Sequence, residues 1–267
     1  MKSPFWRLWD LVRGMVDAPR GAHRIAVAVV YGITCHLIFT AAVLAMIVAM
    51  FFGMSKSLGA VPGPWFLIAN AALILQFPLT HSLLLSKRGR RVLERLAPAP
   101  HGKTLATTTY AIIASIQLLM LFALWTPSGI VWWRAEGVTF VFMCGLYTLP
   151  WLLLIKASYD AGAEVQSGAL GWMSLVQNIR PVFPDMPTFG LFRFVRQPIY
   201  LAFALTLWTV PVWTPDQLVL ALSYTAYCVL APRLKEQRFA QMYGKRFETY
   251  RSEVPYMVPR RKDGNAS

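Results

Sequence analysis

The feature that most constrains this chain is its first long apolar stretch, at about residues 26–52, which contains no Asp, Glu, Lys or Arg. An α-helix needs about 20 predominantly apolar residues to cross the hydrocarbon of a bilayer. Further stretches of the same kind follow at about residues 65–85, 105–125 and 138–155. The sequence therefore predicts an all-α, polytopic integral membrane protein, with four spanning helices in this part.

A transmembrane helical hairpin is predicted nearer the C-terminus. Apolar character returns at residues 198–213 and again at 217–232, and only Thr214-Pro215-Asp216 separates the two segments. Proline is tolerated in the first turn of a helix, where its missing N–H would have no partner in any case. Pro215 can therefore open the second arm of the hairpin.

The positive charge of the chain lies beside the spans. The formal net charge is +14, although only 14% of the residues are charged, whereas soluble domains have about a quarter. Lys and Arg cluster before the first span, after the second, after the fourth and in the tail, while the other loops carry little more than Lys56 and Arg134. Cytoplasmic loops are enriched in these residues, so we expect an inner-membrane protein with both termini in the cytoplasm. Without a separate basic module, no nucleic-acid binding is expected.

Metal and soluble-enzyme motifs are absent from the sequence. It has no Cys/His spacing typical of a metal site, no glycine-rich nucleotide loop and no GxSxG elbow. Cys35, Cys144 and Cys228 each lie in a predicted span, which indicates buried thiols rather than disulfides. We therefore expect no metal.

The pattern along the chain predicts four regions. Residues 1–24 form an interfacial segment, in which an amphipathic helix carries Phe5, Trp9, Val12 and Val16 on one face. Residues 25–156 form the four-helix membrane region, and residues 260–267 are expected to be a disordered tail. Residues 157–259 combine a cytoplasmic loop, the hairpin and a capping tail with cytoplasmic amphipathic helices.

The least membrane-like interval runs from about residue 156 to residue 197. Pro181, Pro184 and Pro187 follow one another closely there, and such spacing forbids a continuous helix. The interval is therefore expected to be a cytoplasmic loop or a cap over a cavity. Asp160 and Glu164 share a helical face at its beginning, because residues four apart are neighbours on a helix.

The densest set of polar residues flanks the hairpin. Arg196-Gln197-Pro198-Ile199-Tyr200-Leu201 precedes it, and Glu236 follows it, before Gly244 and Tyr250. A hairpin returns the chain to the side of the membrane from which it entered. Glu236 can therefore approach Arg196 across forty residues of sequence.

This arrangement resembles the isoprenylcysteine carboxyl methyltransferase superfamily, whose pattern is Arg-His-Pro-x-Tyr, a membrane hairpin, Glu-Glu, then Gly-x-x-Tyr-x-x-Tyr and Val-Pro. The likeness covers roughly residues 81–259. His81-Ser82, the basic loop after it and Leu124-Trp125-x-Pro127 are most similar to the methanethiol S-methyltransferase branch. The chain departs from the family pattern at Gln197 in place of His, at Lys235 in place of the first Glu and at Phe247 in place of the first Tyr.

The resemblance implies a membrane methyltransferase that uses S-adenosyl-L-methionine. Arg196 is expected to fork onto the carboxylate of this cofactor and Glu236 to meet its ammonium or ribose. The other residues expected to bind the cofactor are Gln197, Pro198, Tyr200, Leu201 and Tyr250. For the acceptor, His81, Asp160 and Glu164 are candidates to take the proton of a thiol; with Arg196 and Glu236, His81 completes the predicted catalytic set.

The acceptor stays open at this point. Methanethiol, giving dimethyl sulfide, is the first choice on the resemblance, and an isoprenoid, another lipid-like molecule or a different thiol is the alternative. A non-catalytic membrane protein related to the nitric-oxide-metabolism branch is a second hypothesis, which Gln197 and Lys235 favour and Arg196-x-Pro198-x-Tyr200 opposes. A transporter is a third, but the sequence shows no internal repeat. The expected partners are a small apolar or thiol substrate and the lipid bilayer.

Overall fold

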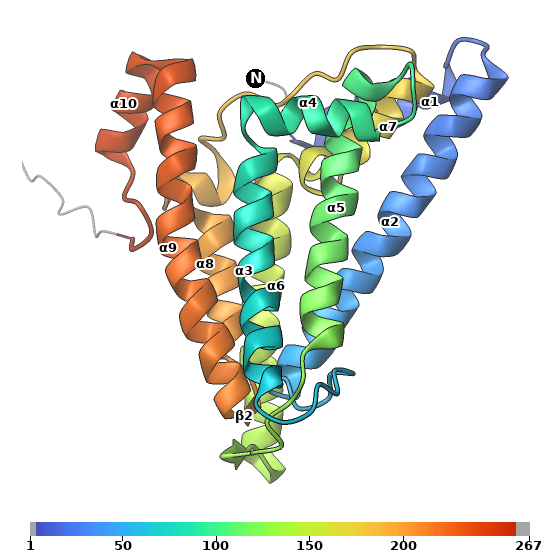
Figure 1. The fold of residues 1–267 in the computed structure, drawn as a ribbon. Coiled ribbons are helices and arrows are strands. Elements are labelled where there is room, and N and C mark those ends of the chain that lie inside the picture. The colour runs from blue at the N-terminus through green and yellow to red at the C-terminus, as the bar shows by residue number, and fades with distance from the viewer. Residues whose placement is uncertain (1–3, 260–267) are drawn as a thin grey trace, which may run out of the picture.

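Long apolar helices dominate the computed structural model, which describes residues 4–259 (Figure 1). Five of them are long and apolar enough to cross a membrane: α2 (Ala22–Phe51), α3 (Trp65–Leu84), α5 (Gly102–Leu124), α6 (Gly137–Gln166) and α9 (Pro215–Tyr243). Large apolar side chains point outward from them; Leu37 of α2 is 67% exposed and Val141 of α6 is 70% exposed. Water would disfavour such a surface, and hydrocarbon would not. The prediction of an all-α polytopic membrane protein is confirmed.

The predicted hairpin is formed by α8 (Pro198–Trp208) and α9, which pack against each other. α8 is shorter than its predicted segment, because the chain leaves the helix for β2 (Val212–Trp213), which pairs antiparallel with β1 (Trp133–Arg134). The side chain of Thr214 accepts a hydrogen bond from Gln217 N at 2.9 Å, and Pro215 occupies the first helical position of α9. Pro215 thus opens the second arm as the sequence predicted, and the Thr214 cap adds to this start.

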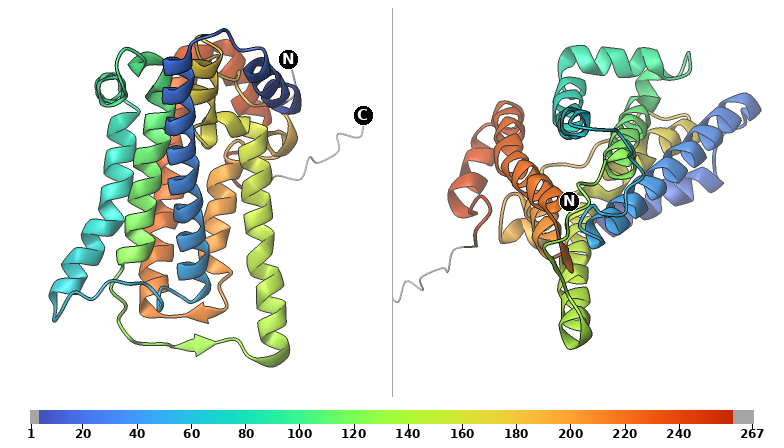
Figure 2. Two further views of the ribbon diagram at one scale, coloured as in Figure 1. Left: turned by 90° about the vertical axis from the view of Figure 1, so that its right-hand side faces the viewer. Right: turned by 60° about the horizontal axis from the view of Figure 1, so that its bottom comes forward.

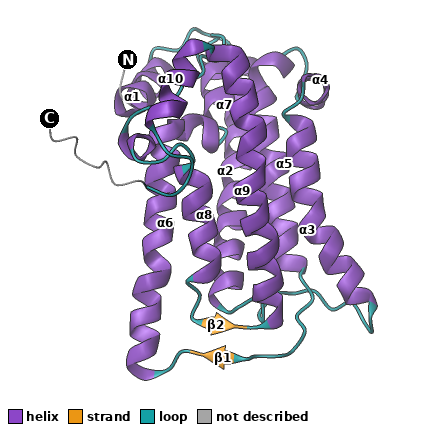
Figure 3. Ribbon diagram, turned by 90° about the vertical axis from the view of Figure 1, so that its left-hand side faces the viewer, coloured by secondary structure: helices purple, strands orange, loops and turns teal. Residues whose placement is uncertain are grey.

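Short helices gather at the opposite end from the strand pair (Figures 2 and 3). They are α1 (Pro4–Val16), α4 (Lys87–Leu96), α7 (Ala169–Val176), the 3-10 turn η1 (Gly190–Arg193) and α10 (Lys245–Glu253). α4 occupies the basic loop after the second span, and the Ser86 side chain caps it by accepting from Gly89 N at 3.0 Å. The first and last described helices therefore share one end of the bundle.

The polar interval contains more helix than the sequence indicated. α6 continues through Asp160 and Glu164 to Gln166, with a break in helical geometry at Gly162 (φ 104°, ψ 88°), and α7 follows. The longest helix-free stretch of the interval is residues 177–189, which holds the three prolines. The predicted division of the chain at residue 157 thus falls inside one helix. The predicted disordered tail, 260–267, lies outside the described residues.

The main core lies between the spans. Its largest fully buried members include Trp125, Tyr224 and Phe122, with Met50 and Leu207 beside them. Trp125 Nε1 donates to Asp216 Oδ1 at 3.0 Å, so the end of α5 is fixed to the start of α9. These contacts hold the hairpin against the earlier helices.

Candidate functional site

The two charged groups that flank the hairpin meet in the structure. Arg196 precedes α8 and Glu236 lies in the last third of α9. Arg196 Nε donates to Glu236 Oε1 at 2.8 Å and Nη2 donates to Oε2 at 3.3 Å. Both side chains are largely covered, with 11% and 14% of their surface exposed. The fork geometry makes this a two-point contact, which is stronger and more directional than a single ion pair.

Arg196 also holds the segment that follows α10. Its Nη1 donates to the carbonyl oxygens of Arg251, at 2.9 Å, and Val254. The backbone N–H of Arg196 donates to Pro255 O at 2.9 Å, and the Tyr256 ring lies 5.6 Å from Arg196 Cζ. A guanidinium has five N–H donors, and these protein contacts engage four of them. Arg196 therefore acts first as a clamp between α9 and the tail.

Two of the three departures from the resembled pattern, Gln197 and Lys235, lie beside this pair. Gln197 is buried, its Nε2 donates to Glu236 Oε1 at 2.9 Å, and its backbone N–H donates to Tyr256 O at 3.2 Å. The Lys235 ammonium lies 3.5 Å from Gln197 Oε1. It also lies over two aromatic rings, 5.7 Å from the centroid of Phe192 and 5.3 Å from that of Phe239. The two altered positions are thus in contact with each other.

The other predicted cofactor residues surround the same site in different ways. Pro198 is buried at the first position of α8, and Leu201 follows within the first turn, its N–H bonded to Gln197 O at 3.0 Å. Tyr200 lies in that turn and is half-buried. Tyr250 is buried in α10 and donates its hydroxyl to Phe192 O at 2.7 Å. Tyr250 therefore positions η1, and its hydroxyl proton is already used in this hydrogen bond.

The tail and the preceding loop contain the ionisable groups with perturbed acidities outside the spans. Burial raises the pKa of the Tyr250 hydroxyl and of the Tyr256 hydroxyl, because the charged form loses hydration. The hydrogen bond from Arg246 lowers the pKa of Asp185, since it stabilises the carboxylate. Arg246 Nη2 lies 2.7 Å from Asp185 Oδ2, which ties α10 to the proline-rich loop.

His81 lies in the last turn of α3, against α5. The Tyr110 hydroxyl is 2.8 Å from its Nδ1 and 2.6 Å from its Nε2, and the Phe77 ring lies 4.9 Å from the His81 ring. Phe77 in turn contacts Tyr227 of α9, with ring centroids 6.1 Å apart. An aromatic layer therefore joins His81 to the hairpin. Tyr110 was not predicted from the sequence, because nothing in a single apolar span shows which residue of another span it faces.

Asp160 and Glu164 are both buried at the end of α6 but bind different partners. Asp160 forms an ion pair with Lys156 and accepts from Leu191 N at 2.9 Å, so it fixes η1. Glu164 Oε1 accepts from Arg7 Nε at 3.0 Å and from Arg7 Nη2 at 2.8 Å. Glu164 Oε2 is buried without a hydrogen-bond partner among the described residues. Both carboxylates thus organise the region around the site rather than entering the Arg196–Glu236 contact.

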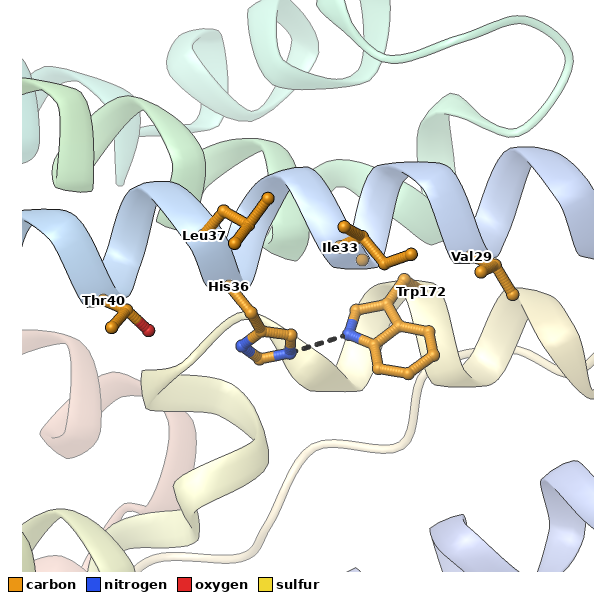
Figure 4. A pocket seen from close by; sticks show the side chains of 7 residues that line it. Val29, Ile33, His36, Leu37, Thr40 and Trp172 are labelled. Atoms are coloured by element: carbon orange, nitrogen blue, oxygen red, sulfur yellow. Dashed lines mark hydrogen bonds between the residues drawn. The ribbon is translucent and has the colours of Figure 1, made fainter.

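A separate groove of about 350 Å³ lies on α2 and α7 (Figure 4). Its lining is mostly apolar and comprises Val29, Gly32, Ile33, His36, Leu37, Thr40 and Trp172. Trp172 Nε1 donates to His36 Nε2 at 3.1 Å within it. The groove contains none of the residues predicted to act on cofactor or substrate. Within the described part of the chain, no group of three His, Cys, Asp or Glu residues could hold a metal ion.

Comparison with known proteins finds relatives along most of the chain. A methanethiol S-methyltransferase of Pseudomonas deceptionensis is 26% identical over 219 residues, 80% of this chain and 82% of that protein. One from Pseudomonas sp. strain GM41(2012) is 27% identical over 239 residues, 86% of this chain and 89% of that protein. The predicted resemblance is confirmed.

The chain also matches a protein of another name over a shorter length. Nurim of Xenopus laevis is 31% identical over 136 residues, 48% of this chain and 47% of that protein. No family model and no solved structure matches the chain. The two methanethiol S-methyltransferase matches cover 80% and 86% of this chain, which is more than a C-terminal motif alone would cover.

Proposed function

We propose that this chain is a membrane methyltransferase that transfers a methyl group from S-adenosylmethionine to a small thiol, with methanethiol as the first choice of acceptor and dimethyl sulfide as product. The observation that carries the proposal is the contact of Arg196 with Glu236 across the hairpin. The names of the relatives, which match most of both chains, support a methyltransferase and this acceptor.

The chemistry of the residues around Glu236 fits the donor. S-adenosylmethionine has an ammonium, a carboxylate, ribose hydroxyls, an aromatic base and a sulfonium, so its site needs an anion, a cation, amide groups and aromatic surfaces. Glu236 keeps accepting capacity on Oε2, Gln197 presents an amide, and Phe192, Phe239 and Tyr256 lie close by. When bound, the donor supplies an electrophilic methyl carbon on a positively charged sulfur.

In this proposal the protein contributes mainly position. Glu236 holds the ammonium or a ribose hydroxyl, Gln197 orients Glu236, and Arg196 keeps both next to the tail. Alignment of the acceptor sulfur with the methyl carbon can supply much of the rate, because it replaces a bimolecular encounter by an oriented contact. With the donor bound, a bond from the acceptor sulfur to the methyl carbon would form as the bond from that carbon to the donor sulfur breaks, and the donor would leave as the neutral thioether.

The acceptor thiol must also lose a proton, since its unperturbed pKa is about 8.5 and the thiolate is the nucleophile. His81 is the residue we assign to this role, because the Phe77 ring lies against it and connects it to Tyr227 of the hairpin. Tyr110 fixes the orientation of its ring. Asp160 and Glu164, the other two candidates, are engaged by Lys156 and Arg7 and serve as positioning residues in this proposal.

We assign the protein to the inner membrane as a multi-pass protein with its site facing the cytoplasm. The helices that carry the basic clusters, α1, α4 and α10, lie at one end of the bundle (Figure 1). Arg196 binds the segment that follows α10, and α9, which carries Glu236, ends where α10 begins. Soluble donor would enter from that end, and an apolar thiol can arrive through the bilayer.

The proposal is tested by headspace detection of dimethyl sulfide from cells that express the chain and receive methanethiol. We expect product from the parent chain and a roughly tenfold to hundredfold lower rate from Glu236→Gln and Arg196→Ala, as losing a charge-assisted contact of about 1.5–3 kcal/mol implies. Arg193→Ala is the matched control, because Arg193 is exposed three residues before Arg196. Absence of product from the well-expressed parent chain would refute the acceptor; unchanged rates in both variants would refute the site.

A further inference from the structure

Lys235 is a cation beside the site, and no carboxylate of residues 4–259 forms an ion pair with it. Its ammonium contacts Gln197 Oε1 only at 3.5 Å, a long distance for a hydrogen bond. The nearest carboxylate, that of Glu236, is engaged by Arg196 and Gln197. Arg196, which binds the same carboxylate, already donates four N–H groups to protein atoms. Lys235 therefore has donors left for a ligand where Arg196 has few.

The surroundings of Lys235 hold its ammonium in place. It lies between the rings of Phe192 and Phe239, at 5.7 Å and 5.3 Å from their centroids. Phe192 is itself fixed, since its carbonyl oxygen accepts from Tyr250 and its helical turn is anchored by Asp160. A cation over aromatic faces is attracted by the rings but keeps its N–H groups for other partners.

We propose that Lys235 binds the carboxylate of the amino-acid end of the methyl donor, and that Arg196 is a positioning residue that holds Glu236 and the tail. This inference rests on the proposed function and assigns a role to a residue that departs from the family pattern. Lys235 and Glu236 are consecutive, so one short stretch of α9 presents a cation and an anion side by side. An α-amino acid has the complementary pair, an ammonium and a carboxylate on one carbon.

The test measures binding of two ligands to the purified full-length protein in detergent micelles by titration calorimetry. One is S-adenosylhomocysteine, and the other is its decarboxylated analogue, in which hydrogen replaces the carboxylate. The parent protein should bind S-adenosylhomocysteine at least about tenfold more tightly, because one charge-assisted hydrogen bond is at stake. Lys235→Met keeps the aliphatic stem between the two rings and removes the charge, so it should bind both ligands about equally.

Matched variants separate this role from a structural one. Lys235→Arg keeps a cation and should keep most of the preference, and Lys245→Gln, which removes an exposed charge from α10, should keep all of it. Arg196→Lys should weaken the binding of both ligands by a similar factor, because it loosens the site but leaves Lys235, the proposed partner of the ligand carboxylate, in place. If Lys235→Met does not fold, Lys235→Gln takes its place with the same expectation.

Each outcome decides a different claim. The assignment of Lys235 is overturned if Lys235→Met still binds S-adenosylhomocysteine about tenfold more tightly than the decarboxylated analogue. It is also overturned if only Arg196→Lys loses this preference. Neither outcome contradicts the proposed donor. Equal binding of the two ligands by the parent protein shows that the carboxylate is not recognised and also overturns the assignment. A parent protein that binds neither ligand contradicts the proposed donor, and the assignment of Lys235 falls with it.

Discussion

Asp160 shows how a buried carboxylate can shape the site without touching it. It accepts from Leu191 N, and the Cα of Gly190 approaches it so closely that a Cβ there would lie 2.2 Å from Asp160 Oδ2. Gly190 also has φ +57°, a conformation that side chains with a Cβ rarely adopt. The turn that places Phe192 beside Lys235 therefore depends on a residue without a side chain.

Gly190→Ala should destabilise the protein by about 2 kcal/mol, because it combines left-handed backbone strain with a collision at Asp160. Gly145→Ala is the matched control. Gly145 lies inside α6 and a Cβ there meets nothing within 4 Å. The stability of this variant protein should therefore stay the same or rise slightly. Reversible unfolding in mixed micelles measures both. Equal stability of the two variants would show that η1 does not need this backbone geometry.

Among the elements, α1 is fixed to the bundle by the side chain of Arg7 and by a hydrogen bond from Gln177 Nε2 to Leu11 O at 3.0 Å. Arg7 reaches Glu164 at the end of α6 and Val182 O in the proline-rich loop, at 3.0 Å. The other side of α1 exposes Phe5, Trp6 and Trp9, at 52–56% of their surface. Aromatic side chains of this kind favour the membrane interface, so α1 connects the lipid surface to the helix that carries Asp160.

Arg7→Met should destabilise the folded protein by about 2 kcal/mol, because it leaves the buried Glu164 carboxylate unpaired. Breaking a completely buried pair costs about 3–5 kcal/mol. The cost is lower here because Arg7 keeps 22% of its side-chain surface exposed. The double variant Arg7→Met/Glu164→Gln should recover much of the loss, because no buried charge remains. Arg13→Met changes an exposed arginine of the same helix and should have little effect. Thermal unfolding in micelles compares the four proteins. A double variant no more stable than Arg7→Met would contradict the pairing.

The spans, the hairpin and the meeting of Arg196 with Glu236 could be predicted, because hydropathy fixes which segments cross the bilayer and a hairpin must return to its starting side. The partners of His81 and Glu164 could not. Tyr110 and Arg7 come from elements distant in sequence, and the order of helices around a bundle is not encoded in the apolarity of each one. The helical continuation of α6 was missed because Gly162 and the prolines beyond it resemble a loop in sequence.

The distribution of charge over the whole molecule sets its orientation. Five basic residues lie in α4 alone, namely Lys87, Arg88, Arg90, Arg91 and Arg95. The strand end carries Lys56, Arg134 and the acidic Glu136. The end with α1, α4 and α10 should thus face the cytoplasm, because positive residues are retained on that side during insertion. Arg196 pairs with Glu236, the neighbour of Lys235, and binds the segment after α10 at that end. In the proposed reaction a charged, water-soluble donor would reach these residues from there.

Single cysteines report this orientation directly. Lys245→Cys in α10 and Glu136→Cys before α6 both replace exposed residues at opposite ends of the bundle. In intact spheroplasts a membrane-impermeant maleimide should modify Glu136→Cys and leave Lys245→Cys unmodified, and permeabilisation should expose both. The parent chain is the blank, because Cys35 and Cys228 are buried and Cys144 lies within α6. The reverse pattern would place Lys235 and Glu236 on the outer side, away from any cytoplasmic donor, and so would contradict both the topology and the proposed reaction with one measurement.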